Sequence, residues 1–213
     1  MGNVLLVREL KVEFHLPEGV IRAVDGVSFR IPEGKTVALV GESGSGKTVI
    51  SQSLMGILPK TAVTAGGEIL FFDPKKQGNF VDIAKLNPDG RAMRKLRGDR
   101  ISIIFQEPMS SLSPLHTIGN QIDEAALLHI GCSASMARTL TTEILSLVGF
   151  PEPSRAVHNY PFELSGGLRQ RAMIAMALVC RPAILIADEP TTALDVTVQA
   201  QILRLIQDLQ SEL

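Results

Sequence analysis

The chain has 213 residues, which is long enough for one α/β domain with a sizeable hydrophobic core. Hydrophobic residues make up 45% of the sequence and charged residues 20%, a composition that excludes an intrinsically disordered chain, a collagen and a disulfide scaffold. Its 21 basic and 22 acidic residues give a net charge of −1, so no bulk positive charge favours nucleic acid as a partner.

The sequence also indicates a cytosolic location. The apolar stretch of residues 172–180 is too short to cross a bilayer, which takes about 20 residues, and charged side chains close to the N-terminus argue against a signal peptide. Cys132 and Cys180 form no CxxC motif, so we expect two reduced thiols.

The N-terminal part of the chain predicts strands first. Residues 4–14 and 21–31 are rich in β-branched side chains, and the turn between them favours an antiparallel pair. Residues 36–40 are a short apolar run, typical of a buried parallel strand. Residues 48–58 carry apolar side chains at helical spacing, and residues 68–72 predict another strand.

The next segment, residues 73–100, is polar, and we expect most of it to lie at the surface. It contains a run of basic side chains, for which a solvated surface is expected and contact with lipid headgroups is the alternative. These residues are Arg91, Arg94, Lys95, Arg97 and Arg100.

The C-terminal half predicts helices between two buried strands. Residues 101–105 and 183–187 are apolar and strand-like, whereas residues 118–148 and 167–179 have helical periodicity. A last helix is marked by an apolar face of Val198, Ile202, Leu205, Leu209 and Leu213. This alternation predicts an α/β fold with a mainly parallel sheet, an N-terminal antiparallel β subdomain and an inserted α-helical subdomain.

The strongest motif is GESGSGKT at residues 41–48, which fits G-x-x-x-x-G-K-[ST] and lies between a predicted strand and a predicted helix. Its three glycines allow backbone conformations in which successive N–H groups converge on phosphate oxygens. Lys47 would reach the β- and γ-phosphates, and the Thr48 hydroxyl would bind Mg²⁺. A glycine-rich turn that binds no ligand is the alternative.

Two carboxylates follow the apolar strand in ILIADE, residues 184–189. Asp188 would approach Mg²⁺ through water, and Glu189 would orient or deprotonate an attacking water. Two solvated acids at the end of a strand are the alternative.

A third motif, LSGGLRQR at residues 164–171, narrows the class of protein. Ser165 can cap a helix that begins near Gly167, and the two glycines leave the first N–H groups of that helix open to an anion. On its own, this pattern would fit an ordinary capped helix about as well.

Together with Gln106 after the strand at residues 101–105 and TTALD at residues 191–195, these motifs resemble the ATP-binding subunits of ATP-binding cassette (ABC) transporters. Their order and spacing match over nearly the whole chain. Three longer strings resemble the dipeptide and oligopeptide importers: FQEPMSSLSPLHTIGNQI, YPFELSGGLRQRAMIAMAL and DEPTTALDVTVQAQI. The apolar Leu168 also fits that branch, whereas the wider family often has Gln at this position.

The resemblance implies a P-loop NTPase core, a head-to-tail dimer, and ATP and Mg²⁺ as ligands. The implied ATP-binding residues are Phe14, Gly41, Glu42, Ser43, Gly44, Ser45, Gly46, Lys47 and Thr48, with Ser165, Gly166 and Gly167 contacting the ATP of the opposite subunit. The implied Mg²⁺ ligands are Thr48, Gln106 and Asp188, and the implied catalytic residues are Lys47, Gln106 and Glu189. Phe14 is the candidate for stacking on adenine, with a core position as the alternative, and Asp195 would lie along the dimer seam.

The implied activity is ATP hydrolysis coupled to the import of di- or oligopeptides or related solutes, at the cytoplasmic face of the inner membrane. The implied partners are a second nucleotide-binding subunit, two membrane permease subunits and, indirectly, an extracytoplasmic solute-binding protein, with no nucleic acid. The alternatives are a fragment that binds nucleotide without hydrolysing it and an ABC ATPase outside transport.

The family places a switch histidine one strand beyond the last helix, whereas all four histidines here precede residues 183–187. We therefore expect a nucleotide-binding domain over residues 1–213 that is incomplete at its C-terminus. The expected parts are an antiparallel region at residues 1–35 and 66–72, a P-loop core at residues 36–60, 101–106 and 166–213, and a helical subdomain at residues 110–165.

Overall fold

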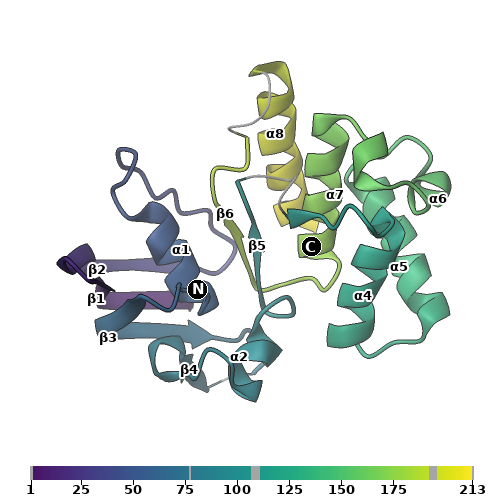
Figure 1. The fold of residues 1–213 in the computed structure, drawn as a ribbon. Coiled ribbons are helices and arrows are strands. Elements are labelled where there is room, and N and C mark those ends of the chain that lie inside the picture. Colours follow the sequence, from purple (N-terminus) through teal and green to yellow (C-terminus); the bar gives the residue numbers. More distant parts are fainter. Residues whose placement is uncertain (1, 77, 107–110, 192–195, 213) are drawn as a thin grey trace. The chain divides into compact units, whose positions relative to one another are not determined.

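The computed structural model describes residues 2–76, 78–106, 111–191 and 196–212. The chain divides into two compact units, Met1–Arg97 and Gly98–Leu213. The first unit is built around an antiparallel sheet, and the second is mostly helical with a short parallel sheet (Figure 1).

The sheet of the first unit has the strand order β2-β1-β3-β4. Its strands are β1 (Asn3–Leu16), β2 (Gly19–Pro32), β3 (Ala62–Phe72) and β4 (Phe80–Asp82), and all neighbours are antiparallel. Several side chains of β1, among them Val7, Leu10 and Val12, are fully buried, with a register shift between Val7 and Leu10. The predicted antiparallel pair is confirmed, and the strand predicted at residues 68–72 begins earlier than expected, at Ala62.

The run at residues 36–40 does not form the predicted parallel strand. A buried parallel strand needs hydrogen-bonded neighbours in its sheet, and none of the described strands pairs with this run. Its side chains are correspondingly open, with Val40 89% exposed. The helix predicted next is present as α1 (Lys47–Met55).

The segment expected to lie mostly at the surface has structure of its own. It contains β4, the 3₁₀ helix η1 (Ile83–Lys85) and α2 (Arg91–Leu96). Ile83 and Met93 are buried, so this segment adds to the hydrophobic core. Two members of the basic run also contradict the prediction of a solvated surface: Arg100 is buried, and Arg97 is half-buried against backbone carbonyls.

In the second unit, β5 (Ile101–Ile104) and β6 (Ile184–Ala187) pair in parallel, with Ile104 opposite Ala187. Six helical elements follow β5 in the described part of the chain: α4 (Ile118–His129), α5 (Ala134–Leu147), α6 (Pro153–Ala156), η2 (Pro161–Glu163), α7 (Gly166–Leu178) and α8 (Val196–Glu212). The parallel sheet is thus confined to two of the described strands, because residues 36–40 do not join it.

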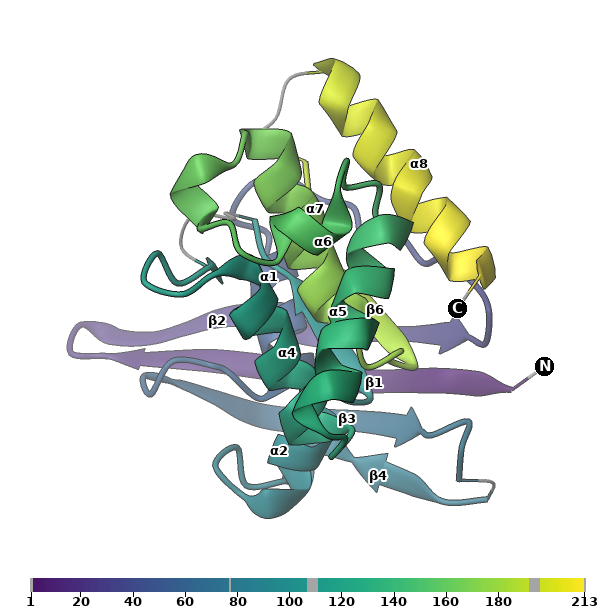
Figure 2. The ribbon, with the colours of Figure 1, turned by 90° about the vertical axis from the view of Figure 1, so that its right-hand side faces the viewer.

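Helices α4, α5 and α7 pack around one hydrophobic core (Figures 1 and 2). Side-chain hydroxyls cap α4 and α5, since Thr117 accepts from Asn120 N and Ser133 accepts from Met136 N. No helix among the described residues combines the length and the apolar character that a membrane span requires.

Candidate functional site

The glycine-rich loop at residues 41–48 lies in the first unit and leads directly into α1. The Lys47 ammonium donates to the carbonyl oxygens of Gly41 at 2.8 Å and Glu42 at 2.7 Å. Ser45 N donates to Glu42 O at 3.2 Å, which closes a tight turn. The loop therefore curls around its own lysine, whose ammonium has a third donor that can serve a phosphate oxygen.

Gly46 is required by the close approach of a second backbone segment. Its φ is +89°, and a Cβ added to it would lie 2.5 Å from the carbonyl oxygen of Ala23. Ala23 is the extra residue of a β-bulge, because Val24 and Arg22 oppose consecutive residues of β1. The bulge in β2 thus packs against the point where the loop becomes a helix.

The N-terminal end of α1 is suited to an anion. Gly46 is its N-cap residue and provides no side-chain cap, and the first turn contains no acidic residue. The positive end of the helix dipole therefore faces the loop without a carboxylate to neutralise it. Thr48 lies in this first turn and is exposed. Together with Lys47, these features fit a bound phosphate group.

Phe14 lies in β1, in the same unit as this loop. It is half-buried and pairs with Ile21 of β2 and Ala62 of β3. Ile21 is two residues from Ala23, the bulged residue that contacts Gly46. Phe14 is thus a partly open aromatic ring whose strand partner is two residues from the bulge at the loop, a position that fits a base-stacking group.

The second unit brings three of the expected residues to one end of its parallel sheet. Ile104 and Ala187 are opposite each other, and the pairing continues with Asp188 N donating to Ile104 O at 3.0 Å. Two residues beyond Ile104, Gln106 Nε2 donates to Glu189 Oε2 at 2.9 Å. The carboxyl ends of β5 and β6 thus hold Gln106, Asp188 and Glu189 together.

The backbone at Glu189 is unusual. Its φ of +47° is in the left-handed region, which residues with a Cβ seldom adopt. Because such a conformation costs about 1–3 kcal/mol, it persists only where the surroundings impose it. Here it turns the chain immediately after β6, where the exposed Glu189 side chain meets Gln106.

The third motif forms the start of α7, as expected. Ser165 is the N-cap residue and accepts from Leu168 N at 3.4 Å, so the predicted cap is confirmed. Ser165 and Gly166 are exposed, whereas a Cβ on Gly167 would approach the Val198 side chain to 3.3 Å. The open helix start can therefore bind an anion, while Gly167, the second residue of α7, packs on α8.

The contacts that hold residues 160–162, just before α7, were not predicted from the sequence. Arg169 Nε donates to Pro161 O at 2.7 Å, and its Nη2 donates to Phe162 O at 3.5 Å. The rings of Tyr160 and Phe162 stack with centroids 5.4 Å apart. Arg169, a basic residue within LSGGLRQR, was the signal available in the sequence. Its partners could not be predicted, because backbone carbonyls have no sequence signature.

The expected site residues thus form two groups, each within one unit. The first group contains Phe14 and residues 41–48, and the second contains Gln106, Asp188, Glu189 and residues 165–167. Asp195, expected at a dimer seam, lies outside the described residues.

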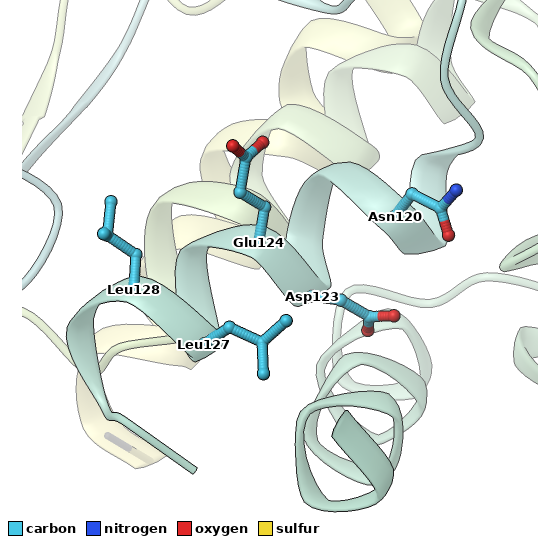
Figure 3. A pocket seen from close by; sticks show the side chains of 5 residues that line it. All are labelled: Asn120, Asp123, Glu124, Leu127 and Leu128. Atoms are coloured by element: carbon cyan, nitrogen blue, oxygen red, sulfur yellow. The ribbon is translucent and has the colours of Figure 1, made fainter. Parts of the chain in front are cut away.

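A pocket of about 490 Å³ in the second unit contains none of these residues (Figure 3). Helix α4 lines it with Asn120, Asp123, Glu124, Leu127 and Leu128. Asp123 already accepts from Thr141 Oγ1 at 2.6 Å and pairs with Arg138 at 2.6 Å. This pocket is therefore not the candidate site.

Comparison with known proteins finds relatives that are named as ATP-binding proteins of peptide transport. The chain is 51% identical over 208 residues to the probable peptide ABC transporter ATP-binding protein y4tR of Sinorhizobium fredii, covering 97% of this chain and 59% of that protein. It is 50% identical over 211 residues to the dipeptide transport ATP-binding protein DppD of Bacillus subtilis, covering 99% of this chain and 60% of that protein. The chain thus spans about 60% of the length of these curated relatives.

Solved structures of ATP-binding cassettes have the same fold. The dimeric cassette MJ0796, in a post-hydrolysis state bound to ADP and Pi, superposes with a TM-score of 0.81 and 28% identity, covering 98% of this chain and 83% of that one. The profile of the family described as "ABC transporter" matches residues 24–192, which include the glycine-rich loop, both carboxylates and the capped start of α7. The chain therefore belongs to the ABC transporter family.

Proposed function

We propose that this chain binds and hydrolyses ATP to energise the import of di- or oligopeptides, or related solutes, through separate permease subunits. The observation that carries the proposal is the loop at residues 41–48, in which the Lys47 ammonium is held by loop carbonyls at the start of α1, where no side chain caps the helix and no acidic residue lies in the first turn. The relatives named as peptide and dipeptide transport proteins, about 50% identical, support the solute class.

In this proposal the loop holds the triphosphate. Lys47 contacts the β- and γ-phosphates. Backbone N–H groups of residues 41–46 donate to phosphate oxygens, except that of Ser45, which donates to Glu42 O. A Cβ on Gly41 would lie 2.6 Å from Ser45 Oγ, so a larger residue at the start of the loop would displace the Ser45 side chain. Phe14 stacks on the adenine ring.

Thr48, Gln106 and Asp188 would hold Mg²⁺. Each offers a hydroxyl, amide or carboxylate oxygen, the ligand type that Mg²⁺ prefers. A bound Mg²⁺ would neutralise part of the phosphate charge.

Glu189 acts as the general base. Gln106 donates to Glu189 Oε2, which orients the carboxylate for accepting a proton from water. The water oxygen bonds to the γ-phosphorus as that proton moves to Glu189, and the bond from the γ-phosphorus to the bridging oxygen breaks with its electron pair going to ADP.

The proposed assembly is a dimer of nucleotide-binding subunits. Ser165, Gly166 and Gly167 contact the ATP held by the other subunit, a role supported by the exposed, glycine-rich start of α7 and by the dimeric state of the related cassette. The dimer associates with two permease subunits at the cytoplasmic face of the inner membrane, and through them with an extracytoplasmic solute-binding protein. No nucleic acid takes part.

Binding of an ATP analogue and co-purification with permease subunits test this proposal. We expect saturable, Mg²⁺-dependent binding of ATP and recovery of the chain in detergent extracts with co-expressed peptide permease subunits. A chain that binds ATP but does not associate with any permease would overturn the transport role, and a chain that binds no ATP would overturn the proposal altogether.

A further inference from the structure

Arg97 links the end of α2 to the end of α1. Its Nε donates to Met55 O at 2.6 Å, and its Nη2 donates to Gly56 O at 2.6 Å and to Pro88 O at 2.7 Å. All of these residues lie in the first unit. One guanidinium therefore joins three backbone carbonyls, two of them at the C-terminal end of the helix that follows the phosphate loop.

The carbonyl of Met55 cannot be satisfied by extending α1. In a longer helix Met55 O would accept from the N–H of residue 59, but residue 59 is proline and has no N–H. Gly56 ends the helix in the left-handed conformation, and its N–H and that of Ile57 return to carbonyls of the preceding turn. Arg97 thus supplies donors that the local sequence lacks.

Arg97 also supplies charge at this position. The last turn of α1 contains no basic residue, so its negative end has no cation of its own. A cation placed there stabilises the helix through its dipole, whose positive end lies at Lys47 and Thr48. Burial lowers the pKa of Arg97, opposed by the negative charge of Asp89, but an arginine side chain remains charged in proteins.

Side-chain packing also holds α2 against the C-terminal end of α1. Met93 of α2 is buried, and a Cβ on Gly56 would lie 3.3 Å from its Cγ and Sδ atoms and 3.1 Å from an Arg97 nitrogen. Both side chains therefore pack tightly against Gly56, and α1 has only nine residues, about 13 Å. A displacement at one end of so short and rigid a helix moves the other end as well.

We propose that Arg97 is a positioning residue for nucleotide: by fixing the C-terminal end of α1, it sets the position of Lys47 and Thr48 at the phosphate loop. This inference rests on the proposed function. Arg97 touches no nucleotide in this proposal and acts through the helix.

The test compares three variants of the chain, Arg97→Gln, Arg97→Lys and Arg94→Gln. Arg94 is an exposed residue of the same short helix, so Arg94→Gln is a matched loss of charge away from α1. Affinity for mant-ATP, steady-state kcat and KM, and amide hydrogen exchange of residues 47–57 are measured well below the unfolding midpoint of each variant.

We expect Arg97→Gln to weaken mant-ATP binding and raise KM about tenfold, because a charged donor and a dipole partner are both lost. Its kcat should change less than about twofold, since groups that act on the water are untouched. Exchange in α1 should rise. Arg97→Lys keeps the charge but not the fork of donors, so it should recover part of the affinity, and Arg94→Gln should match wild type.

Several outcomes would overturn the inference. Unchanged mant-ATP affinity in Arg97→Gln would do so even if exchange in α1 rises, because Arg97 would then only cap the helix. An equal loss in Arg94→Gln would show a general charge effect. A wild-type chain that binds no mant-ATP would overturn the proposed function itself and this inference with it.

Discussion

Gln106 Nε2 donates a hydrogen bond to Glu189 Oε2 at 2.9 Å, joining two side chains that are 83 positions apart in the sequence. The parallel register places them together, because Gln106 follows Ile104 by two residues and Glu189 follows Ala187 by two residues. A general base must be held in one orientation to accept a proton efficiently. Gln106 is therefore expected to contribute to turnover through Glu189 as well as through Mg²⁺.

Replacing Gln106 by Leu tests this relationship. The change removes a hydrogen bond to a charged group, worth about 1.5–3 kcal/mol, so kcat should fall roughly tenfold or more. The amount of Mg²⁺ needed for half-maximal rate should rise as well. Gln207→Leu, at an exposed position of α8, is the control for the added apolar side chain. Equal kcat values for the two variants would exclude a role for the Gln106–Glu189 contact.

Lys47→Ala should weaken ATP binding by roughly tenfold to a hundredfold, because a charged donor to phosphate is lost. The loop loses its internal brace at the same time, since Lys47 holds the carbonyls of Gly41 and Glu42. Lys35→Ala, which removes an exposed lysine from the same unit, should leave affinity unchanged. Calorimetric titration with ATP in the presence of Mg²⁺ gives the ATP affinity of each variant. Equal affinities for Lys47→Ala and Lys35→Ala would contradict a role of Lys47 in binding ATP.

Gly46→Ala and Gly44→Ala should differ in their effect on stability. Both glycines have positive φ, so alanine costs about 1–2 kcal/mol of left-handed strain at either position. Only Gly46 faces a backbone oxygen, that of Ala23, and a Cβ there must displace the β2 bulge, whereas nothing lies within 4 Å of a Cβ on Gly44. Urea unfolding should therefore show the larger loss for Gly46→Ala. Equal losses would contradict the close contact with Ala23.

The two cysteines should react at different rates. Burial raises the pKa of the Cys180 thiol from 9.0 to about 11, and the negative charges of Asp99 and Cys132 add to the effect. Cys132 is only half-buried. At pH 8, iodoacetamide should therefore modify Cys132 first, with peptide mass spectrometry as the readout.

The same pKa shift predicts a pH window for stability. In the unfolded chain the Cys180 thiol ionises above pH 9.0, whereas in the folded chain it stays protonated until about pH 11. The folded state therefore loses stability as the pH rises between these values. Relative to Cys180→Ala, the free energy of unfolding of the wild-type chain should fall over that window and be constant below it. A difference that does not vary with pH would contradict the shift.

Much of the site could be predicted because its motifs are local. The cap at Ser165, the helix after the glycine-rich loop and the strand before Asp188 each follow from residues next to one another in the sequence. The resemblance to ABC proteins added the expectation that the start of α7 in one subunit acts on the ATP held by the glycine-rich loop of the other.

The features that could not be predicted depend on partners far along the chain. Residues 36–40 have the apolar run of a buried strand, but a strand forms only where another strand pairs with it. Arg97 looks like part of a solvated basic run, whereas in the structure its guanidinium donates to the carbonyls of Met55 and Gly56, 42 and 41 positions earlier. The left-handed backbone at Glu189 likewise has no local signal such as glycine.

The most direct test of the proposed function measures ATP affinity and steady-state hydrolysis side by side for the wild-type chain and Glu189→Gln. The substitution keeps the size of the side chain but removes the base, so hydrolysis should fall by about 10²–10⁴-fold while ATP affinity stays within about twofold. Phosphate release that is equal in the two proteins would contradict the assignment of Glu189 as the general base of an ATPase.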